Sequence, residues 1–276
     1  MIDLHLHTTA SDGTYAPSEL VHQARAAGLT IISITDHDTT SGSDAAAGPA
    51  REAGVELIPG IEISAVADGR DVHVLGYFIN PGAAALRAFL DRQRADRVRR
   101  IAEMSDRLGA LGCRIDVAPI LADAGRGRSV GRPQIAEALL NAGYVQTPDE
   151  AFARFLNHNG SAYVPRFGAL PAEVVAIIHD AGGIASLAHP GPNALDHLIA
   201  PLAAAGLDAI EADHSDHDAP TRARYRALAS QLGLLVTGGS DFHGPSGHRT
   251  ARLGEITLPA EDFESLSRKA GRRRAH

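Results

Sequence analysis

The first thirteen residues bring two histidines and a carboxylate together at a spacing that suits a metal ion. His5 and His7 alternate with Leu4 and Leu6, so the run is predicted to be a strand with both imidazoles on one face. Residues two apart on a strand lie roughly 6–7 Å from each other, so their imidazoles can converge on one ion. Asp12 follows a few residues later. This stretch alone would also fit hydrogen-bonded core histidines, so the interpretation depends on the rest of the chain.

Histidines and carboxylates also lie in or just after six further predicted strands. They are Asp36, His37 and Asp38 after residues 29–35, Glu62 in residues 55–63, His73 in residues 72–77, His189 after residues 184–188, residues 213–217 after residues 207–212, and Asp241 and His243 after residues 234–238. Imidazole and carboxylate donors suit manganese, iron or zinc. Such a cluster without metal would leave buried charges unpaired, at a cost of several kcal/mol per ion. Nine residues are the predicted ligands, enough for two or three ions: His5, His7, Asp12, His37, Glu62, His73, His189, Asp241 and His243.

The elements that must position these groups alternate along the chain. Apolar strand-like runs are followed by segments with helical spacing, such as residues 17–27, 45–53, 171–181 and 194–205. Seven strands in this rhythm predict an α/β protein with a parallel sheet that forms a closed or nearly closed barrel. Active sites of α/β barrels lie at the C-terminal ends of the strands. The predicted ligands fall at those ends, and Glu62 is placed to bridge two ions.

The middle of the chain has a different character. From about residue 82, a stripe at helical spacing predicts a long amphipathic helix, and residues 125–131 form a glycine-rich break before another helix. We interpret residues 1–95 and 167–267 as a discontinuous barrel domain, residues 96–166 as an inserted, mainly helical subdomain that caps the substrate, and residues 268–276 as a frayed basic tail. The stripe consists of Leu86, Phe89, Leu90, Val98, Ile101, Met104, Leu108 and Leu111.

Charge, cysteine content and hydrophobic segments exclude several classes of protein. The formal charge of −7 argues against a broad surface for coating nucleic acid. The one cysteine, Cys113, excludes a disulfide framework and a cysteine-rich zinc site, and is expected to be a small buried residue. Neither a secretion signal nor a membrane span is indicated. We therefore expect a cytoplasmic protein without membrane association, and no obligate protein partner is evident.

The histidine and carboxylate clusters resemble the motifs of the polymerase and histidinol phosphatase (PHP) family. The resemblance lies in His5-Leu-His7 with Ser11-Asp12-Gly13, in Thr35-Asp36-His37, in Ala188-His189-Pro190 and in Ser240-Asp241-Phe242-His243, with Glu62 and His73 at further expected ligand positions. It spans the whole chain. It implies a distorted, TIM-like (β/α)7 barrel that binds two or three divalent metal ions, commonly Mn²⁺, with Zn²⁺ or Fe²⁺ also possible.

Within that family, the chain is most similar to bacterial phosphoesterases that carry a helical insertion, at Gly131-Arg132-Pro133 and Tyr163-Val164-Pro165. The implied activity is removal of the 3′-phosphate from nucleoside 3′,5′-bisphosphates, with 5′–3′ trimming of short RNA in some relatives. Gln134 and Ser161 depart from the histidine and lysine that such relatives often carry, which disfavours binding of a long phosphate backbone.

Chemistry suggests roles for several residues. We expect in-line attack on phosphorus by hydroxide formed from a metal-bound water whose pKa is lowered to about 7. Arg132 is the predicted catalytic and substrate-binding phosphate clamp, since its guanidinium fits two phosphate oxygens; without the resemblance, a surface arginine is an equal interpretation. His37, His189 or a metal-bound water could assist the leaving oxygen. The predicted contacts to base or sugar are Asn157, His158 and Asn159, although asparagines that form a turn are the alternative interpretation. His214 is a further predicted substrate contact, and it and His217 follow a strand end where they could line the pocket.

The remaining histidines are not among the predicted ligands. His22, His179 and His197 are expected on helices, and His248 and His276 in a loop and the tail.

The sequence is also compatible with other functions. A histidinol-phosphate-type phosphatase would belong to another branch of the same family. An amidohydrolase also opens with His-x-His, but many use a modified lysine as the metal bridge, and Lys269 is the one lysine in the chain. A metal-stabilised module without catalysis is the alternative from a different class.

Overall fold

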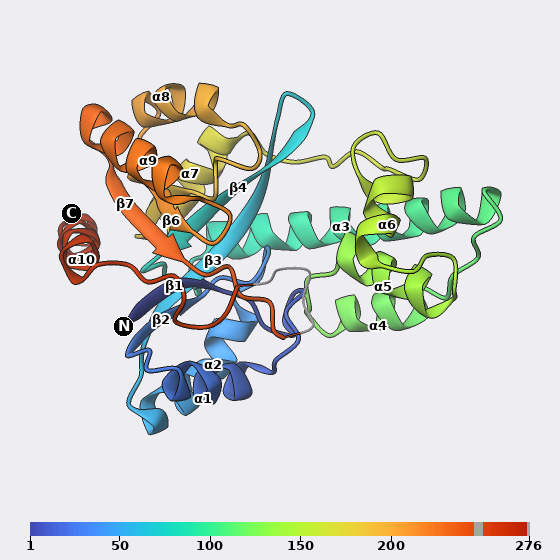
Figure 1. Cartoon of the computed structure of the whole chain (residues 1–276), viewed down its shortest axis with the longest axis horizontal. Coiled ribbons are helices and arrows are strands. Elements are labelled where there is room, and N and C mark those ends of the chain that lie inside the picture. The colour runs from blue at the N-terminus through green and yellow to red at the C-terminus, as the bar shows by residue number, and fades with distance from the viewer. Residues whose placement is uncertain (246–250, 275–276) are drawn as a thin grey trace.

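Seven strands form one sheet that curls into a nearly closed barrel in the computed structural model, which describes residues 1–245 and 251–274 (Figure 1). The predicted α/β barrel is confirmed. Strand order follows the sequence, and β7 returns beside β1, where the Phe242 carbonyl accepts a 3.0 Å hydrogen bond from the His7 amide. The strands are β1 (Ile2–Leu6), β2 (Ile31–Ile34), β3 (Glu56–Ala67), β4 (Arg70–Tyr77), β5 (Ile184–Leu187), β6 (Ala209–His214) and β7 (Leu235–Gly239).

The prediction of a parallel sheet is wrong for one strand, because β4 runs antiparallel to both β3 and β5. Asp68 and Gly69 join β3 to β4 with φ angles of 52° and 73°, the left-handed pair that a two-residue hairpin requires. The reversal places the beginning of β4 at the edge where its neighbours end. His73 pairs with Ser64 there, so it reaches the same face as the other predicted ligands.

Helices cover the outside of the barrel, and an apolar core fills the space beneath them. The prediction of a frayed tail is wrong for residues 268–274, because they form the last part of the helix α10 (Ala260–Arg274). Lys269 and Arg273 on that helix each lie 2.9 Å from the buried Asp208 carboxylate, which ties the helix to the barrel. His248 and His276 lie outside the described residues. The outer helices are α1 (Pro17–Ala26), α2 (Ser41–Ala53), α7 (Pro171–Asp180), α8 (Asp196–Ala204), α9 (Ala219–Leu232) and α10 (Ala260–Arg274).

The long helix α3 (Ala84–Ala110) belongs to two cores. Its first half packs Leu86 and Leu90 into the barrel core, whereas Ile101 and Leu108 pack into a second core formed by the inserted segment. The second core, with its surrounding helices, forms the lobe at the right of Figure 1. Two members of the predicted apolar stripe, Val98 and Leu111, are exposed instead. The lobe also contains α4 (Ala118–Gly125), α5 (Arg132–Asn141), α6 (Pro148–Ala151) and the π-helix η1 (Phe152–Leu156).

One buried carboxylate fastens both connections between the lobe and the barrel. Arg97, on the way into the lobe, donates from Nε to Asp38 over 2.7 Å, and Arg166, on the way out, donates to the same oxygen over 3.4 Å. Arg97 also donates to the Val130 carbonyl inside the lobe. Because Asp38 follows the predicted ligand His37, the lobe is held at a fixed place beside the clustered histidines.

In the described ranges, none of the helices combines the length and the apolar character that crossing a membrane demands. Cys113 is buried with a free thiol, as expected.

The free energy of unfolding should depend on pH through the carboxyl group of Asp208. Burial raises the pKa of its carboxyl, but hydrogen bonds from His179, the Ala185 amide and Lys269 outweigh burial and hold the pKa below its ordinary value. A depressed pKa stabilises the fold above the unfolded value of about 4, and the contribution disappears as pH falls through the folded pKa. We expect Asp208→Asn to lower the free energy of unfolding by about 2 kcal/mol at pH 7 and by less at pH 3, which lies below the unfolded pKa.

Urea denaturation at a series of pH values measures this difference. Asp106→Asn, which changes an exposed carboxylate of α3, is the control and should have little effect at any pH. An equal loss of stability for Asp208→Asn at pH 7 and pH 3 would contradict the electrostatic explanation.

Candidate metal centre

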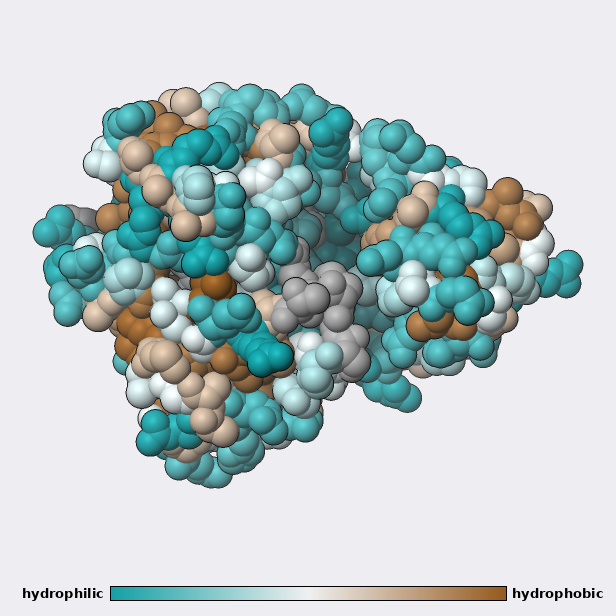
Figure 2. Space-filling model, viewed as in Figure 1, coloured by the Kyte–Doolittle hydropathy of each residue, from teal (hydrophilic) through white to brown (hydrophobic). Residues whose placement is uncertain are grey.

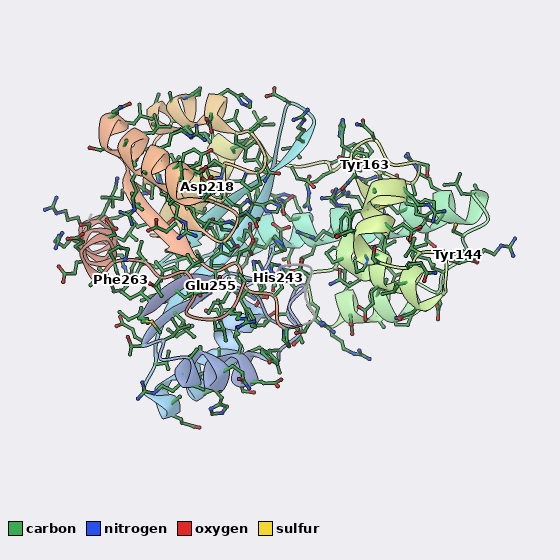
Figure 3. The ribbon with its side chains drawn as sticks, viewed as in Figure 1. Tyr144, Tyr163, Asp218, His243, Glu255 and Phe263 are labelled. Atoms are coloured by element: carbon green, nitrogen blue, oxygen red, sulfur yellow. The ribbon has the colours of Figure 1, made fainter. Side chains whose placement is uncertain are left out.

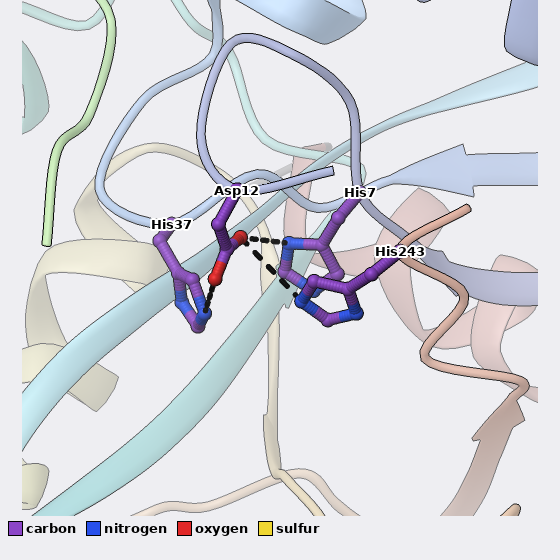
Figure 4. A group of neighbouring side chains, drawn as sticks. All are labelled: His7, Asp12, His37 and His243. Atoms are coloured by element: carbon purple, nitrogen blue, oxygen red, sulfur yellow. Dashed lines mark ion pairs between the residues drawn. The ribbon is translucent and has the colours of Figure 1, made fainter. Parts of the chain in front are cut away.

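The structure brings all nine predicted ligands to one end of the barrel. Most come from the end of a strand or the segment after it, whereas Glu62 lies in the middle of β3 and His73 lies in the first half of the reversed β4. Three of their groupings are compact enough to surround one ion each. They are His7, Asp12, His37 and His243 (Figure 4), then His5, His7, Glu62 and Asp241, then His37, Glu62 and His73.

Glu62 occupies the centre of the cluster. Its side chain is 1% exposed and lies on β3 in the middle of the ring of ligands. Both carboxylate oxygens are shared between imidazoles from different strands, which is the arrangement expected of a bridging ligand. The contacts from Oε2 are 3.2 Å to His5, 3.1 Å to His7 and 3.2 Å to His37, and those from Oε1 are 2.7 Å to His73 and 3.1 Å to His189.

Asp12 lies at the centre of the grouping that it forms with His7, His37 and His243. Its Oδ1 atom lies 3.6 Å from His7 Nδ1 and 3.4 Å from His243 Nε2, and its Oδ2 atom lies 3.7 Å from His37 Nε2 (Figure 4). These separations are longer than good hydrogen bonds. The four side chains therefore converge on a common space more than they bond to one another, as ligands around an ion do.

Buried polar atoms test whether metal fits this cluster. His7 Nε2, Asp12 Oδ1, His37 Nδ1 and His73 Nδ1 have no hydrogen-bond partner with acceptable geometry in the described part of the chain. Leaving such atoms buried and unsatisfied costs free energy. Divalent cations would satisfy all of them, and nitrogen and oxygen donors without thiolates suit manganese, iron or zinc. The clusters are consistent with a multinuclear metal site.

The pKa values of the imidazoles diverge within the cluster. Burial lowers the pKa of His7, but the carboxylates of Asp241 and Glu62, 3.2 and 3.1 Å from its Nε2 atom, outweigh burial and raise the pKa to about 10. In His189 burial dominates and lowers the pKa to about 4, although Glu62 opposes the change. Metal binding requires neutral imidazoles. Metal must therefore displace protons held between these histidines and carboxylates, which makes its affinity fall in acid.

Glu211 is a functional residue that sequence analysis missed. Its Oε1 atom lies 2.8 Å from His5 Nδ1, and its Oε2 atom accepts a 2.8 Å hydrogen bond from the His189 amide. A carboxylate behind a metal-binding histidine fixes the orientation of the ring, and here it turns His5 Nε2 toward Glu62. The available signal was a glutamate inside the apolar run of β6, two residues before the polar cluster that the sequence analysis considered.

The loop that carries Asp12 is fastened to the inserted lobe. The Ala10 carbonyl accepts a 2.8 Å hydrogen bond from the Ser129 amide, and the Ser11 carbonyl accepts one of 2.9 Å from Gln134 Nε2. Gln134 Oε1 in turn accepts from the Gly131 amide over 2.8 Å. Both ends of the Gln134 side chain are thus occupied by backbone groups, so this residue positions the loop and offers no cation.

A cavity of about 290 Å³ lies between the metal centre and the lobe. Four arginines face the metal centre across it: Arg97, Arg100, Arg132 and Arg166. Arg132 Nη2 donates to Asp71 over 2.9 Å, and its Nη1 donates to the Leu156 carbonyl over 3.3 Å. Figure 2 shows hydrophilic side chains flanking the hollow between barrel and lobe, and Figure 3 labels His243 on the barrel side and Tyr163 on the lobe.

The structure does not bring every predicted substrate contact to the cavity. Asn157, His158 and Asn159 are exposed and lie outside its lining. His214 is fully buried behind the metal centre, with Nε2 3.3 Å from Asp241 Oδ2. His217 is also buried and accepts a hydrogen bond from the Gly191 amide. A position just past a strand end therefore does not by itself place a side chain in the cavity.

Gly239 on β7 lies too close to His5 to carry a side chain. A Cβ atom there would lie 2.4 Å from the His5 Cβ atom, whereas one at Gly271 on α10 would meet nothing within 4 Å. We expect Gly239→Ala to destabilise the protein by about 2 kcal/mol through overpacking and to lower bound metal per chain by displacing His5. Gly271→Ala should raise stability slightly, because alanine favours helix by about 1 kcal/mol over glycine.

Thermal unfolding and elemental analysis of both variants measure these effects. Full metal content in a stable Gly239→Ala protein would show that the close approach of β7 to His5 does not matter.

Three comparisons with known proteins agree with this geometry. The family model described as PHP domain matches residues 3–144. A 5′-3′ exoribonuclease from Haemophilus influenzae is 37% identical over 252 residues, covering 89% of this chain and 90% of the relative. A 3′,5′-nucleoside bisphosphate phosphatase from Chromobacterium violaceum is 32% identical, covering 88% and 87%. A solved structure from Bifidobacterium adolescentis, assigned as a metal-dependent phosphoesterase, superimposes with a TM-score of 0.88 at 36% identity, covering 96% of this chain and 94% of that one.

Proposed function

The chain belongs to the PHP domain family of metal-dependent phosphoesterases, and on that premise we propose that it removes the 3′-phosphate from nucleoside 3′,5′-bisphosphates. The family alone leaves the substrate undecided, because the relatives at 37% and 32% identity are an exoribonuclease and a bisphosphate phosphatase. The choice between these substrates therefore depends on the size and charge of the cavity.

The observation that carries the proposal is that one small cavity combines a metal centre with a cluster of arginines. A phosphate at the metal centre would leave the arginines for a second phosphate of the same molecule. A cavity of about 290 Å³ suits a mononucleotide better than an oligonucleotide. A small molecule with two phosphates matches this distribution of charge.

Arg100 is a buried cation of the cavity that lacks one hydrogen-bond acceptor. It is 3% exposed, its Nε donates to the Val164 carbonyl, and its Nη2 has no hydrogen-bond partner among the described residues. Burial and the neighbouring Arg166 lower its pKa to about 10, although Asp71 opposes them. A phosphate oxygen would supply both the missing acceptor and the missing negative charge.

The residues of the cavity divide the chemistry among them. The nine predicted ligands would hold two or three divalent ions, for which Mn²⁺ is our first choice and Zn²⁺ or Fe²⁺ the alternatives. When bound, such ions supply a nucleophile from water at neutral pH and neutralise charge on the phosphoryl oxygens. Arg132 would orient a phosphate through two parallel hydrogen bonds. His37 and His189 line the cavity; whichever of them does not hold an ion, or else a water on an ion, would assist the leaving oxygen.

A second candidate function is 5′–3′ trimming of short RNA, which the similarity to the exoribonuclease favours. The two departures noted in the sequence weaken it. Gln134 contributes no charge, and Ser161 is exposed and donates to the Arg154 carbonyl outside the cavity lining. A long phosphate backbone would therefore lack cations at both positions.

The amidohydrolase alternative needs a lysine at the candidate metal centre. Lys269 lies on α10 and contacts Asp208, outside the lining of the cavity, whereas Glu62 already lies between the imidazoles. A modified lysine is thus not available as the metal bridge.

Phosphate release from a panel of substrates with Mn²⁺ tests the proposed function. We expect adenosine 3′,5′-bisphosphate to be hydrolysed with a higher kcat/KM than short RNA or histidinol phosphate, since the cavity accepts one nucleotide with two phosphates. Equal rates on short RNA would favour the exonuclease, and preference for histidinol phosphate would favour that branch of the family. No turnover at full metal occupancy would leave a binding module.

Arg132→Ala tests the phosphate clamp. Removing a charge-assisted pair of hydrogen bonds should lower kcat/KM for the bisphosphate by about 10- to 100-fold, corresponding to about 1.5–3 kcal/mol. Arg126→Ala is the matched control, because Arg126 is 73% exposed in the same lobe and pairs with Asp123. An unchanged kcat/KM in a folded, metal-loaded Arg132→Ala protein would remove Arg132 from the site.

A further inference from the structure

Two uncharged residues interrupt an otherwise ionisable cavity. Every residue that lines the 290 Å³ cavity carries a carboxylate, imidazole or guanidinium group except Pro133 and Phe152. Both come from the inserted lobe, Pro133 from the first turn of α5 and Phe152 from the beginning of η1. The apolar part of the cavity lining therefore comes from the lobe, next to Arg132.

Phe152 lies beside the arginine that would bind a phosphate. It is half-buried, and its inner side packs against the apolar core of the lobe. The guanidinium carbon of Arg132 lies 5.9 Å from its ring centroid, so the phosphate clamp and the aromatic ring are neighbours. A molecule held by Arg132 would carry its remaining atoms past this ring.

The apolar part of the lining also borders a second hollow. A groove of about 890 Å³ adjoins the cavity, and Pro133 and Phe152, with Asp12, line both. The charged residues of the groove are mainly acidic: Asp116, Asp123 and Glu137 face it, while Arg128 is paired with Asp123. Carboxylates repel further phosphates, so the groove suits a neutral group that ends the substrate.

We propose that Pro133 and Phe152 form a nucleobase subsite, in which the base of the substrate stacks on the Phe152 ring at the opening between cavity and groove. Every base has a flat π face, and stacking on an aromatic side chain contributes about 1–3 kcal/mol per base. The subsite rests on the proposed function for the placement of the phosphates. It takes over the role that the sequence analysis gave to Asn157, His158 and Asn159, which lie outside the cavity lining.

The subsite gives the enzyme a preference for nucleotides over sugar phosphates of equal charge. The acidic groove adds a limit on length, because a nucleotide chain that continued past the base would bring phosphates toward Asp116 and Glu137. Stacking accepts any base, so purine and pyrimidine substrates should differ less than nucleotide and base-free substrates do.

The test compares adenosine 3′,5′-bisphosphate with its abasic analogue, 1-deoxyribose 3,5-bisphosphate, in the Mn²⁺-loaded enzyme. Phe152→Ala should raise KM for the nucleotide about tenfold, within the range for loss of one stacked base, with little change for the abasic compound. Phe152→Leu, which keeps apolar packing without a π face, should show the same loss of discrimination, and Phe152→Tyr should restore it. Phe167→Leu removes an exposed ring that stacks on Arg99 outside the cavity and is the aromatic control.

Discrimination that survives in folded, metal-loaded Phe152→Ala and Phe152→Leu enzymes would overturn the subsite. If the wild-type protein hydrolyses no bisphosphate, the proposed function fails, and calorimetric binding of AMP and of ribose 5-phosphate then tests the subsite separately. Tighter binding of AMP that disappears in Phe152→Leu would support stacking. Equal binding of the two compounds by the wild type would refute it.

Discussion

The burial of Glu62 among imidazoles from five places in the chain is the constraint on which the rest of the structure depends. A carboxylate that is 1% exposed is tolerated only when positive charge surrounds it. The barrel supplies that charge by directing histidines inward at one end, and metal ions would replace the protons that those histidines share with the carboxylates. The outer helices, the hairpin and the lobe all serve to keep these donors converged.

The arrangement around Glu62 is supported by layers of hydrogen bonds. Glu211 orients His5 and holds the His189 amide, while Asp36 accepts from the Thr8 amide and the Ser11 hydroxyl to shape the loop that presents Asp12. A metal-binding geometry needs such support, because ligands are productive only within small errors of position. The lobe joins the same network through Gln134.

Most of the fold and the convergence of the nine candidate ligands could be predicted from the sequence, because most of these residues follow or end an apolar run that forms a strand, and Glu62 and His73 lie within such runs. The antiparallel β4 was missed although Asp68-Gly69 is a strong hairpin signal. Residues 268–274 were misjudged because their charge suggested a solvated end, whereas Asp208, sixty residues earlier, provides the partner that orders them. Glu211, Arg100 and Phe152 were out of reach for a related reason. Their roles depend on which side chains other segments place opposite them, and spacing along one segment does not encode that.

The sharing of α3 between two cores fixes the distance between the barrel and the lobe. One unbroken helix runs from Ala84 to Ala110, and Asp38 holds both crossings in place. The barrel supplies the candidate metal ligands, whereas Pro133 and Phe152 of the lobe complete the lining of the cavity. A substitution on the inner surface of the lobe would therefore change the walls around a substrate while the width of the opening and the ligand cluster stay the same.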